Sequence, residues 1–495
     1  MRRSIFAIVL TVAAAGGSLG APTLAASAPT SAHHAFAPSP LEWTPCQRGY
    51  AECATLTVPL DDSVADGPTI DLGLARVPAR DPDRRIGSLV VNPGGPGAPA
   101  TDFAADFAPT LPDEILDRFD IVGFDPRGVG ESEGVDCLDD LDPLYELDWT
   151  STDAATRAEF VAGVQAVVDA CVASDGTLLP YLATERTARD MDRVREALGD
   201  DRLTYLGFSY GTYLGALYAA QFPERVRALV LDGAVDPGLD ATAVQVEQSE
   251  GFEHSLDLFL ADCAEDAGCA FHHDGDPAGA YDALRARIAD APIRASGAPG
   301  RRDLNTTLFD TGVTLLLYDG KSSWPALADA LRRADRGDGS DLVRYADVYT
   351  GRSGDGRYDD LQESFWAVGC ADGPGFGGLD GLRAIEEEAA RAAPRLGRAI
   401  VNNSLACALW PVQPGALPSV ASETTMPVLV LGTRNDPATP LAWAKGLARE
   451  IGPPARLVVA RGSRHTAFLA GNRCVDRTVL RYLLDEVAPR SKKIC

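Results

Sequence analysis

The sequence has few basic side chains for its length. Its 495 residues carry 45 Lys and Arg against 71 Asp and Glu, which gives a formal net charge of −26. Such a surface repels nucleic-acid phosphates and anionic membranes. We therefore expect no nucleic-acid partner, and we attribute the charge to a solvated acidic surface.

Long apolar runs are also lacking beyond the N-terminus, so we expect no membrane span. The first residues differ, because a basic Met1-Arg2-Arg3 precedes apolar residues 5–15 and the small side chains of Ala26-Ser27-Ala28. This pattern predicts a secretory signal peptide over residues 1–28 and an extracellular location. Residues 29–40 are rich in Ala, Ser and Pro and are expected to form a flexible segment.

The sequence contains no C-x-x-C pair, a usual ligand pattern of zinc sites, and we give the pair His272-His273 no role. We expect no metal and no cofactor. The ten cysteines are an even number in a chain predicted to be exported, which favours disulfides. Many pairings are open to ten cysteines, but proximity favours five: Cys46–Cys53, Cys137–Cys171, Cys263–Cys269, Cys370–Cys407 and Cys474–Cys495.

One pentapeptide lies between a short apolar run and a helical pattern. Gly207-Phe208-Ser209-Tyr210-Gly211 fits the G-x-S-x-G motif of a strand–turn–helix nucleophile. Such a turn raises the serine hydroxyl above the sheet, at the start of a helix whose amides favour negative charge. We predict that Ser209 is a nucleophile. A glycine-rich turn with an inactive serine would show the same pentapeptide. The assignment of Ser209 therefore depends on finding a catalytic base and acid elsewhere in the sequence.

Apolar strands alternate with helical segments over much of the chain, which predicts an α/β fold with a mostly parallel sheet and helices on both faces. A β-hairpin is expected at residues 54–60 and 70–77. Between residues 238 and 406 the helical pattern dominates and predicts a cap inserted into an α/β-hydrolase core of residues 41–237 and 407–495. Further strands are predicted at residues 88–91, 118–124, 203–206, 226–231, 426–432 and 456–460.

Two polar residues follow consecutive strands near the C-terminus. Asp436 follows one strand and His465 follows the next, and only His465 among the six histidines directly follows a predicted sheet strand. A serine needs an imidazole to take its proton, and the imidazole needs an acid to hold its tautomer. Ser209, Asp436 and His465 occur in the order of α/β-hydrolase triads. Asp232 and Asp236 also follow a strand and are alternatives to Asp436.

The loop Asn92-Pro93-Gly94-Gly95-Pro96-Gly97 directly follows a predicted strand. Three glycines and two prolines in six residues exclude helix and strand. Backbone amides in such a loop are accessible to a reacting carbonyl group, as an oxyanion hole requires. We predict the amides of Gly95 and Tyr210 as the two donors.

Three motifs resemble those of the proline-iminopeptidase-related α/β-hydrolases: Asn92–Gly97, Asp125-Pro126-Arg127-Gly128-Val129-Gly130-Glu131-Ser132 and Gly207–Gly211. The chain departs from iminopeptidases at Asn92-Pro93, where those enzymes usually have His before the glycines. Other segments resemble more closely the secreted actinobacterial tripeptidyl aminopeptidase branch: Leu231-Asp232-Gly233, Cys370-Ala371-Asp372, Cys407 with Trp410-Pro411, and the loops of Asp436 and His465.

The resemblance implies a serine exopeptidase that releases short peptides, tripeptides in the closer branch, from the free N-termini of peptides or proteins. Recognition of the charged amine calls for a carboxylate, for which Asp372, Glu363 and Asp232 are candidates. A monomer is expected. A secreted carboxylesterase or lipase-like hydrolase and a proline iminopeptidase are alternatives. A non-catalytic binding protein is disfavoured because all the triad and oxyanion elements are present.

Overall fold

The computed structural model describes residues 40–46, 51–64, 66–373, 375–412, 415 and 417–495. The signal peptide predicted over residues 1–28 lies outside the described residues. The segment predicted to be flexible, residues 29–40, also lies outside them except for Pro40.

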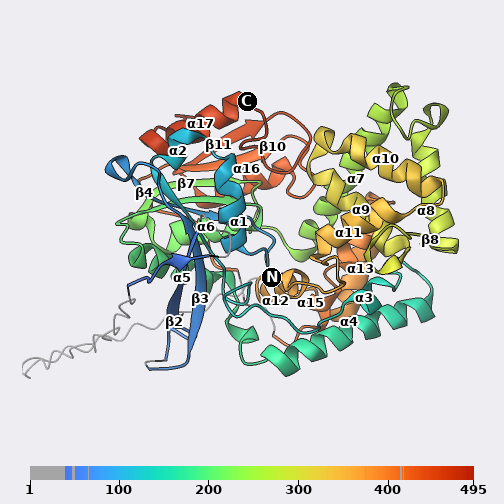
Figure 1. Ribbon diagram of the computed structural model, residues 1–495, viewed down its shortest axis with the longest axis horizontal. Helices are drawn as coiled ribbons and strands as arrows, with labels where there is room; N and C mark the ends of the chain where they lie inside the picture. Colours follow the sequence, from blue (N-terminus) through green and yellow to red (C-terminus); the bar gives the residue numbers. More distant parts are fainter. Residues whose placement is uncertain (1–39, 47–50, 65, 374, 413–414, 416) are drawn as a thin grey trace, which may run out of the picture. The chain divides into compact units, whose positions relative to one another are not determined.

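One sheet contains both the predicted hairpin and the predicted parallel strands (Figure 1). Its strands are β1 (Thr44–Pro45), β2 (Glu52–Pro59), β3 (Thr69–Val77), β4 (Gly87–Asn92), β5 (Phe119–Phe124), β6 (Leu203–Phe208), β7 (Val226–Asp232), β10 (Val428–Thr433), β11 (Ala455–Ala460) and β12 (Lys493–Ile494). The order is β1-β2-β3-β5-β4-β6-β7-β10-β11-β12. The β1–β2, β2–β3 and β3–β5 pairs are antiparallel and the others are parallel, which confirms a mostly parallel sheet.

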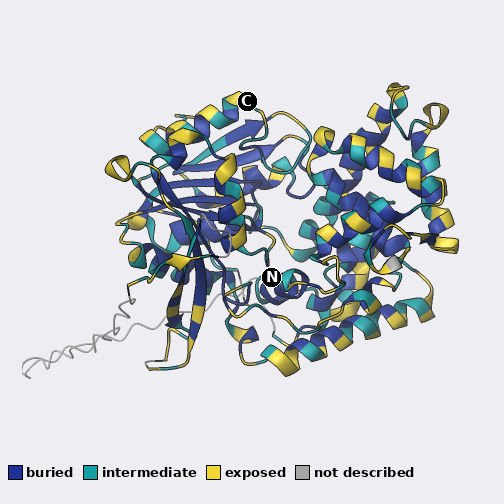
Figure 2. Cartoon of the chain, viewed as in Figure 1, coloured by how far each residue is buried: buried dark blue, intermediate teal, exposed yellow. Residues whose placement is uncertain are grey.

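Helices cover both faces of this sheet. Strands β4, β5, β6 and β10 are buried along their whole length (Figure 2). Successive side chains of a strand point to opposite faces, so Leu89 and Val91 belong to one apolar cluster and Val90 to the other. The helices outside the cap region are α1 (Ala100–Phe107), α2 (Asp113–Leu116), α3 (Asp142–Tyr145), α4 (Ala154–Asp175), α5 (Thr184–Ala197), α6 (Tyr210–Gln221), α16 (Leu441–Ile451) and α17 (Arg473–Asp485). Residues of α1, α2 and α17 pack in the first cluster, and residues of α5, α6 and α16 in the second.

The region between β7 and β10 is mainly helical, as its periodicity predicts. It contains α7 (Ala241–Glu265), α8 (Pro277–Asp290), α9 (Thr306–Tyr318), α10 (Trp324–Asp335), α11 (Ser340–Thr350), α12 (Leu361–Ala371), α13 (Gly378–Ala392), α14 (Gly397–Asn402), α15 (Leu405–Leu409) and the short β8 (Ile293–Arg294) and β9 (Asp303–Leu304). We call these elements the cap. Residues 38–495 form one compact unit, so the boundaries drawn at residues 238 and 406 stay a prediction.

All five expected disulfides are present, which confirms the pairing that proximity favours. Cys370–Cys407 joins α12 to α15 within the cap, and Cys474–Cys495 joins the C-terminal residue to α17. The sulfur atoms are therefore not available as thiolate ligands.

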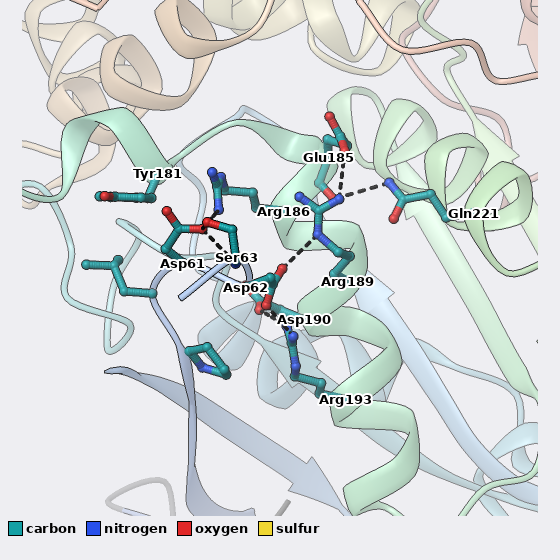
Figure 3. Close-up of polar contacts among 12 residues, drawn as sticks. Asp61, Asp62, Ser63, Tyr181, Glu185, Arg186, Arg189, Asp190, Arg193 and Gln221 are labelled. Carbon is teal, nitrogen blue, oxygen red and sulfur yellow. Dashed lines mark hydrogen bonds and ion pairs between the residues drawn. The ribbon is translucent and has the colours of Figure 1, made fainter. Parts of the chain in front are cut away.

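Ion pairs tie the turn between β2 and β3 to helix α5 (Figure 3). Asp62 accepts a hydrogen bond from Arg189 at 2.8 Å and also pairs with Arg193, which lies 3.1 Å from Asp190. Asp190 in turn binds Arg127 through two hydrogen bonds of 2.8 and 2.9 Å, and both side chains are almost fully buried. Because the loop that carries Arg127 follows β5, this pair fixes α5 against the sheet.

We expect Arg127→Met to lower the free energy of unfolding by about 3–5 kcal/mol, because it removes the main partner of a buried carboxylate. Urea unfolding followed by circular dichroism measures the change. Arg80→Met is the matched control, since the Arg80–Asp113 pair is largely exposed and should contribute little. An equal, small effect of the two substitutions would contradict a structural role for the buried pair.

Candidate active site

Ser209 lies at the turn between β6 and α6 with φ 52° and ψ −122°. This left-handed backbone conformation is strained for a residue with a side chain. The flanking Gly207 and Gly211 do not have a positive φ. Glycine is required at these positions because neighbouring atoms lie too close for a Cβ. A Cβ on Gly207 would lie 2.4 Å from the carbonyl oxygen of Gly211, and one on Gly211 would lie 2.6 Å from Oδ1 of Asn92. The motif thus meets the steric demands of the turn.

His465 and Asp436, which follow β11 and β10, lie side by side. Nδ1 of His465 is 2.9 and 3.0 Å from the two carboxylate oxygens of Asp436. Asp436 is buried and accepts hydrogen bonds from the amides of Ala438 and Thr439 at 3.0 and 2.9 Å, and from the Thr439 hydroxyl at 3.1 Å. Nε2 of His465 is buried and has no hydrogen-bond partner among the described residues, Ser209 included. That nitrogen is available to accept a proton.

The environment of His465 favours its protonated form. Burial lowers the pKa of the imidazole, but the charge and hydrogen bond of Asp436 outweigh burial, and the charge of Asp232 adds to them. The net effect raises the pKa above the ordinary 6.5. A proton taken from a serine would therefore be held more firmly than on a free imidazole.

Asp232 is not a partner of the histidine side chain. It is fully buried at the end of β7, and its carboxylate accepts hydrogen bonds of 2.7 to 3.0 Å from the amides of Ala467 and Phe468. Burial raises the pKa of Asp232 to about 6. The residue secures the loop that follows His465, and the structure does not bring it into either cavity beside Ser209. Its predicted contact with substrate has no support in this geometry.

The glycine-rich loop after β4 lies against the Ser209 turn. A Cβ on Gly94 would lie 2.9 Å from Cβ of Ser209 and 3.1 Å from the amide nitrogen of Tyr210. Tyr210 is the first residue of α6, so its amide has no acceptor within the helix. Gly95 lines the same cavities as Ser209. Both predicted oxyanion donors therefore lie beside the serine.

Two cavities meet at Ser209, and residues of the core and of the cap line both. The larger has a volume of about 280 Å³ and mainly apolar walls, including Leu239, Phe365 and Trp443. The smaller has a volume of about 130 Å³ and aromatic walls. Asp236 and Asp372 are among the residues that line the larger cavity, and its described lining residues include no Lys, Arg or His.

Asp372 is the one predicted amine ligand that lies in the larger cavity. Its carboxylate accepts a hydrogen bond from the amide of Thr184 at 2.9 Å and another from the Thr184 hydroxyl, which also contacts the phenol of Tyr210. Burial raises the pKa of Asp372 to about 7, although the hydrogen bonds from Thr184 oppose this effect. A cationic ligand would stabilise the charged carboxylate.

Glu363 lies elsewhere, contrary to the prediction that it contacts substrate. It is fully buried, and its Oε1 accepts hydrogen bonds from the amides of Cys137 and Leu138 at 3.2 and 3.0 Å. Burial, with the nearby charge of Asp136, raises the pKa of Glu363 to about 8. The adjacent Cys137–Cys171 disulfide offers no thiolate, so this group does not fit a metal.

Three residues at the site were not identified from the sequence. Thr439 contacts both Asp436 and His465, and its amide donates to the Asp436 carboxylate, which caps the turn as acidic side chains commonly do. Tyr213 lies in the first turn of α6, four residues after Ser209, and both residues line the larger cavity. Gln245 comes from α7 in the cap, and no sequence pattern connects it to Ser209.

Comparisons with known proteins agree with this architecture. A family model described as "alpha/beta hydrolase fold" matches residues 87–275, and one described as "TAP-like protein" matches residues 393–495. The chain is 36% identical to the serine protease Hip1 of Mycobacterium tuberculosis over 92% of this chain and 91% of that protein. It is 37% identical to carboxylesterase B of the same species, covering 90% and 86%. It is 29% identical to the tripeptidyl aminopeptidase of Streptomyces lividans, covering 90% and 84%.

In the part of the chain that the structure describes, no helix is both long enough and apolar enough to cross a membrane.

We expect kcat/KM for an uncharged chromogenic ester to fall as the pH falls through the pKa of His465, because a protonated imidazole cannot accept the serine proton. Since the site raises this pKa, the midpoint of the acid limb should lie above 6.5. Asp372→Asn is the control, because the pKa of the Asp372 carboxyl, about 7, lies close to the expected midpoint. The fall in kcat/KM at acid pH should persist in that variant. A midpoint below 6.5 would contradict the proposed environment of the base.

Asp436→Asn should lower kcat about 10⁴-fold, because the amide no longer holds the imidazole in the required tautomer. Asp232→Asn should have a much smaller effect, since Asp232 contacts only the backbone after His465. Turnover of the same ester per mole of protein, with folding checked by circular dichroism, separates the two variants. The reverse order of losses would show that Asp232 is the acid of the triad.

Proposed function

The chain is a serine hydrolase of the α/β-hydrolase family, and from this we propose that it is an extracellular exopeptidase which releases short peptides, tripeptides by preference, from free N-termini. The relatives named serine protease and tripeptidyl aminopeptidase support peptide substrates. Five disulfides support a location outside the reducing cytosol.

In the proposed mechanism, Oγ of Ser209 attacks the scissile carbonyl carbon while Nε2 of His465 takes the hydroxyl proton. Asp436 holds Nδ1–H and stabilises the imidazolium. The amides of Gly95 and Tyr210 donate to the oxyanion, and each such donor typically contributes about 3 kcal/mol. His465 then gives its proton to the departing amine, and water releases the acyl group by the same steps in reverse.

One observation carries the proposal that the substrate has a free amine. Two acidic residues, Asp236 and Asp372, line the larger cavity beside Ser209, and no basic residue is among its described lining residues. By contrast, Asp310 in the smaller cavity is paired with Arg285 at 2.7 and 2.9 Å. We therefore assign Asp372, with Asp236 as a second negative charge, to recognition of the substrate ammonium group.

A carboxylesterase is the second candidate. The relative named carboxylesterase B and the largely apolar walls of the larger cavity favour it. The triad geometry serves both reactions, because an ester and an amide pass through similar tetrahedral intermediates. Substrate tests must separate the two activities.

We expect kcat/KM for a tripeptide p-nitroanilide with a free N-terminus to exceed that of its acetylated form by about 10- to 100-fold, the range of one or two charge-assisted hydrogen bonds. Asp372→Asn should reduce this ratio because the carboxylate would no longer attract the ammonium. Ser209→Ala should abolish both turnover and fluorophosphonate labelling. Equal cleavage of the free and acetylated peptides by the unmodified enzyme would contradict the exopeptidase assignment.

A further inference from the structure

Two buried polar atoms belong to residues that line the larger cavity and have no hydrogen-bond partner among the described residues. They are Oη of Tyr213 and Oε1 of Gln245. The two residues are only 5% and 8% exposed. A buried donor or acceptor without a partner destabilises the folded protein, so its persistence calls for an explanation. One explanation is a ligand that supplies the missing hydrogen-bond partners.

The unpaired atom of Gln245 is a hydrogen-bond acceptor. Nε2 of this residue donates to Oγ of Ser404 at 3.1 Å, and in this orientation of the amide Oε1 is the atom without a partner among the described residues. The remaining carbonyl oxygen can only accept a hydrogen bond. A substrate N–H satisfies it, whereas an ester oxygen or a hydrocarbon chain does not.

Tyr213 supplies the complementary group. It lies on α6 one turn after Ser209, so its phenol is anchored to the same helix as the nucleophile turn. Burial raises the pKa of Tyr213, and the charges of Asp372 and Glu185 raise it further, so the phenol keeps its proton. Its hydroxyl can therefore donate to a carbonyl oxygen.

We propose that Gln245 and Tyr213 read the main chain of a peptide substrate. Oε1 of Gln245 accepts a hydrogen bond from a substrate N–H, and Oη of Tyr213 donates one to a substrate carbonyl. This inference rests on the proposed peptidase function and names the residues that make the site prefer a peptide to a simple ester.

The preference follows from what each substrate leaves unpaired. A fatty-acyl ester fills the apolar walls of the cavity but leaves both polar atoms without partners. Sites built to hydrogen-bond a substrate group reject an analogue that lacks the group by as much as 10⁴- to 10⁵-fold. Removing one of the two polar atoms from the enzyme should therefore cost peptide turnover and spare ester turnover.

The test compares a tripeptide p-nitroanilide with a free N-terminus and the p-nitrophenyl ester of a short fatty acid. Gln245→Met and Tyr213→Phe remove the polar atoms and keep the approximate shape of each side chain. Each variant should lose about 10- to 100-fold in kcat/KM for the peptide, with little change for the ester. Fluorophosphonate titration of Ser209 counts the folded, active molecules.

Tyr281→Phe is the matched control. The phenol of Tyr281 is also buried without a partner among the described residues, but it belongs to the cap interior and lines neither cavity beside Ser209. Its removal should leave the ratio of peptide to ester turnover unchanged.

The outcomes separate this inference from the proposed function. Unchanged peptide turnover in both variants would overturn the inference and leave the peptidase assignment intact. Equal losses on peptide and ester would also overturn it, because the residues would then support the common machinery. Ester cleavage without any peptide cleavage by the unmodified enzyme would overturn the proposed function itself.

Discussion

The strained turn at Ser209 is the constraint on which the rest of the site depends. A positive φ at a residue with a side chain persists only where the surroundings hold it. Here the amide of Ser209 donates to the carbonyl of Asp232 at 2.9 Å, and Gly94 lies too close to the turn for any side chain. The positions of β4, β6 and β7 are thus tied to one residue, and the oxyanion loop is brought to it by the same contacts.

The acidic residues near the site differ in role because their hydrogen-bond partners differ. Asp232 ends β7 and Asp436 follows the neighbouring strand β10, yet Asp436 binds an imidazole and Asp232 binds backbone amides. Glu363 and Asp372 lie nine residues apart in the cap sequence, but only Asp372 lines the cavity beside Ser209. Burial raises the pKa of both carboxyls, so the pKa does not distinguish the two residues. Their roles differ because only Asp372 lines a cavity that a ligand can enter.

The cap and the core share the site. The core contributes the nucleophile turn, and the cap contributes Gln245 and Asp372 to the wall of the same cavity. The backbone of Tyr318 in the cap accepts a hydrogen bond from the amide of His465 at 2.7 Å. Substrate selection and placement of the base are therefore coupled to the packing of the cap.

The sequence by itself determined the fold class and the strand ends that carry Ser209, Asp436 and His465, and it favoured, without deciding, the disulfide pairs that the structure confirms. Each follows from local patterns or from chain order, because parallel strands deliver their C-terminal ends to one edge of a sheet. Only the tertiary structure decided which acids face the cavity and which polar atoms lack partners. These depend on contacts between distant segments, such as Thr184 with Asp372 across 188 residues, and no local pattern encodes burial of that kind.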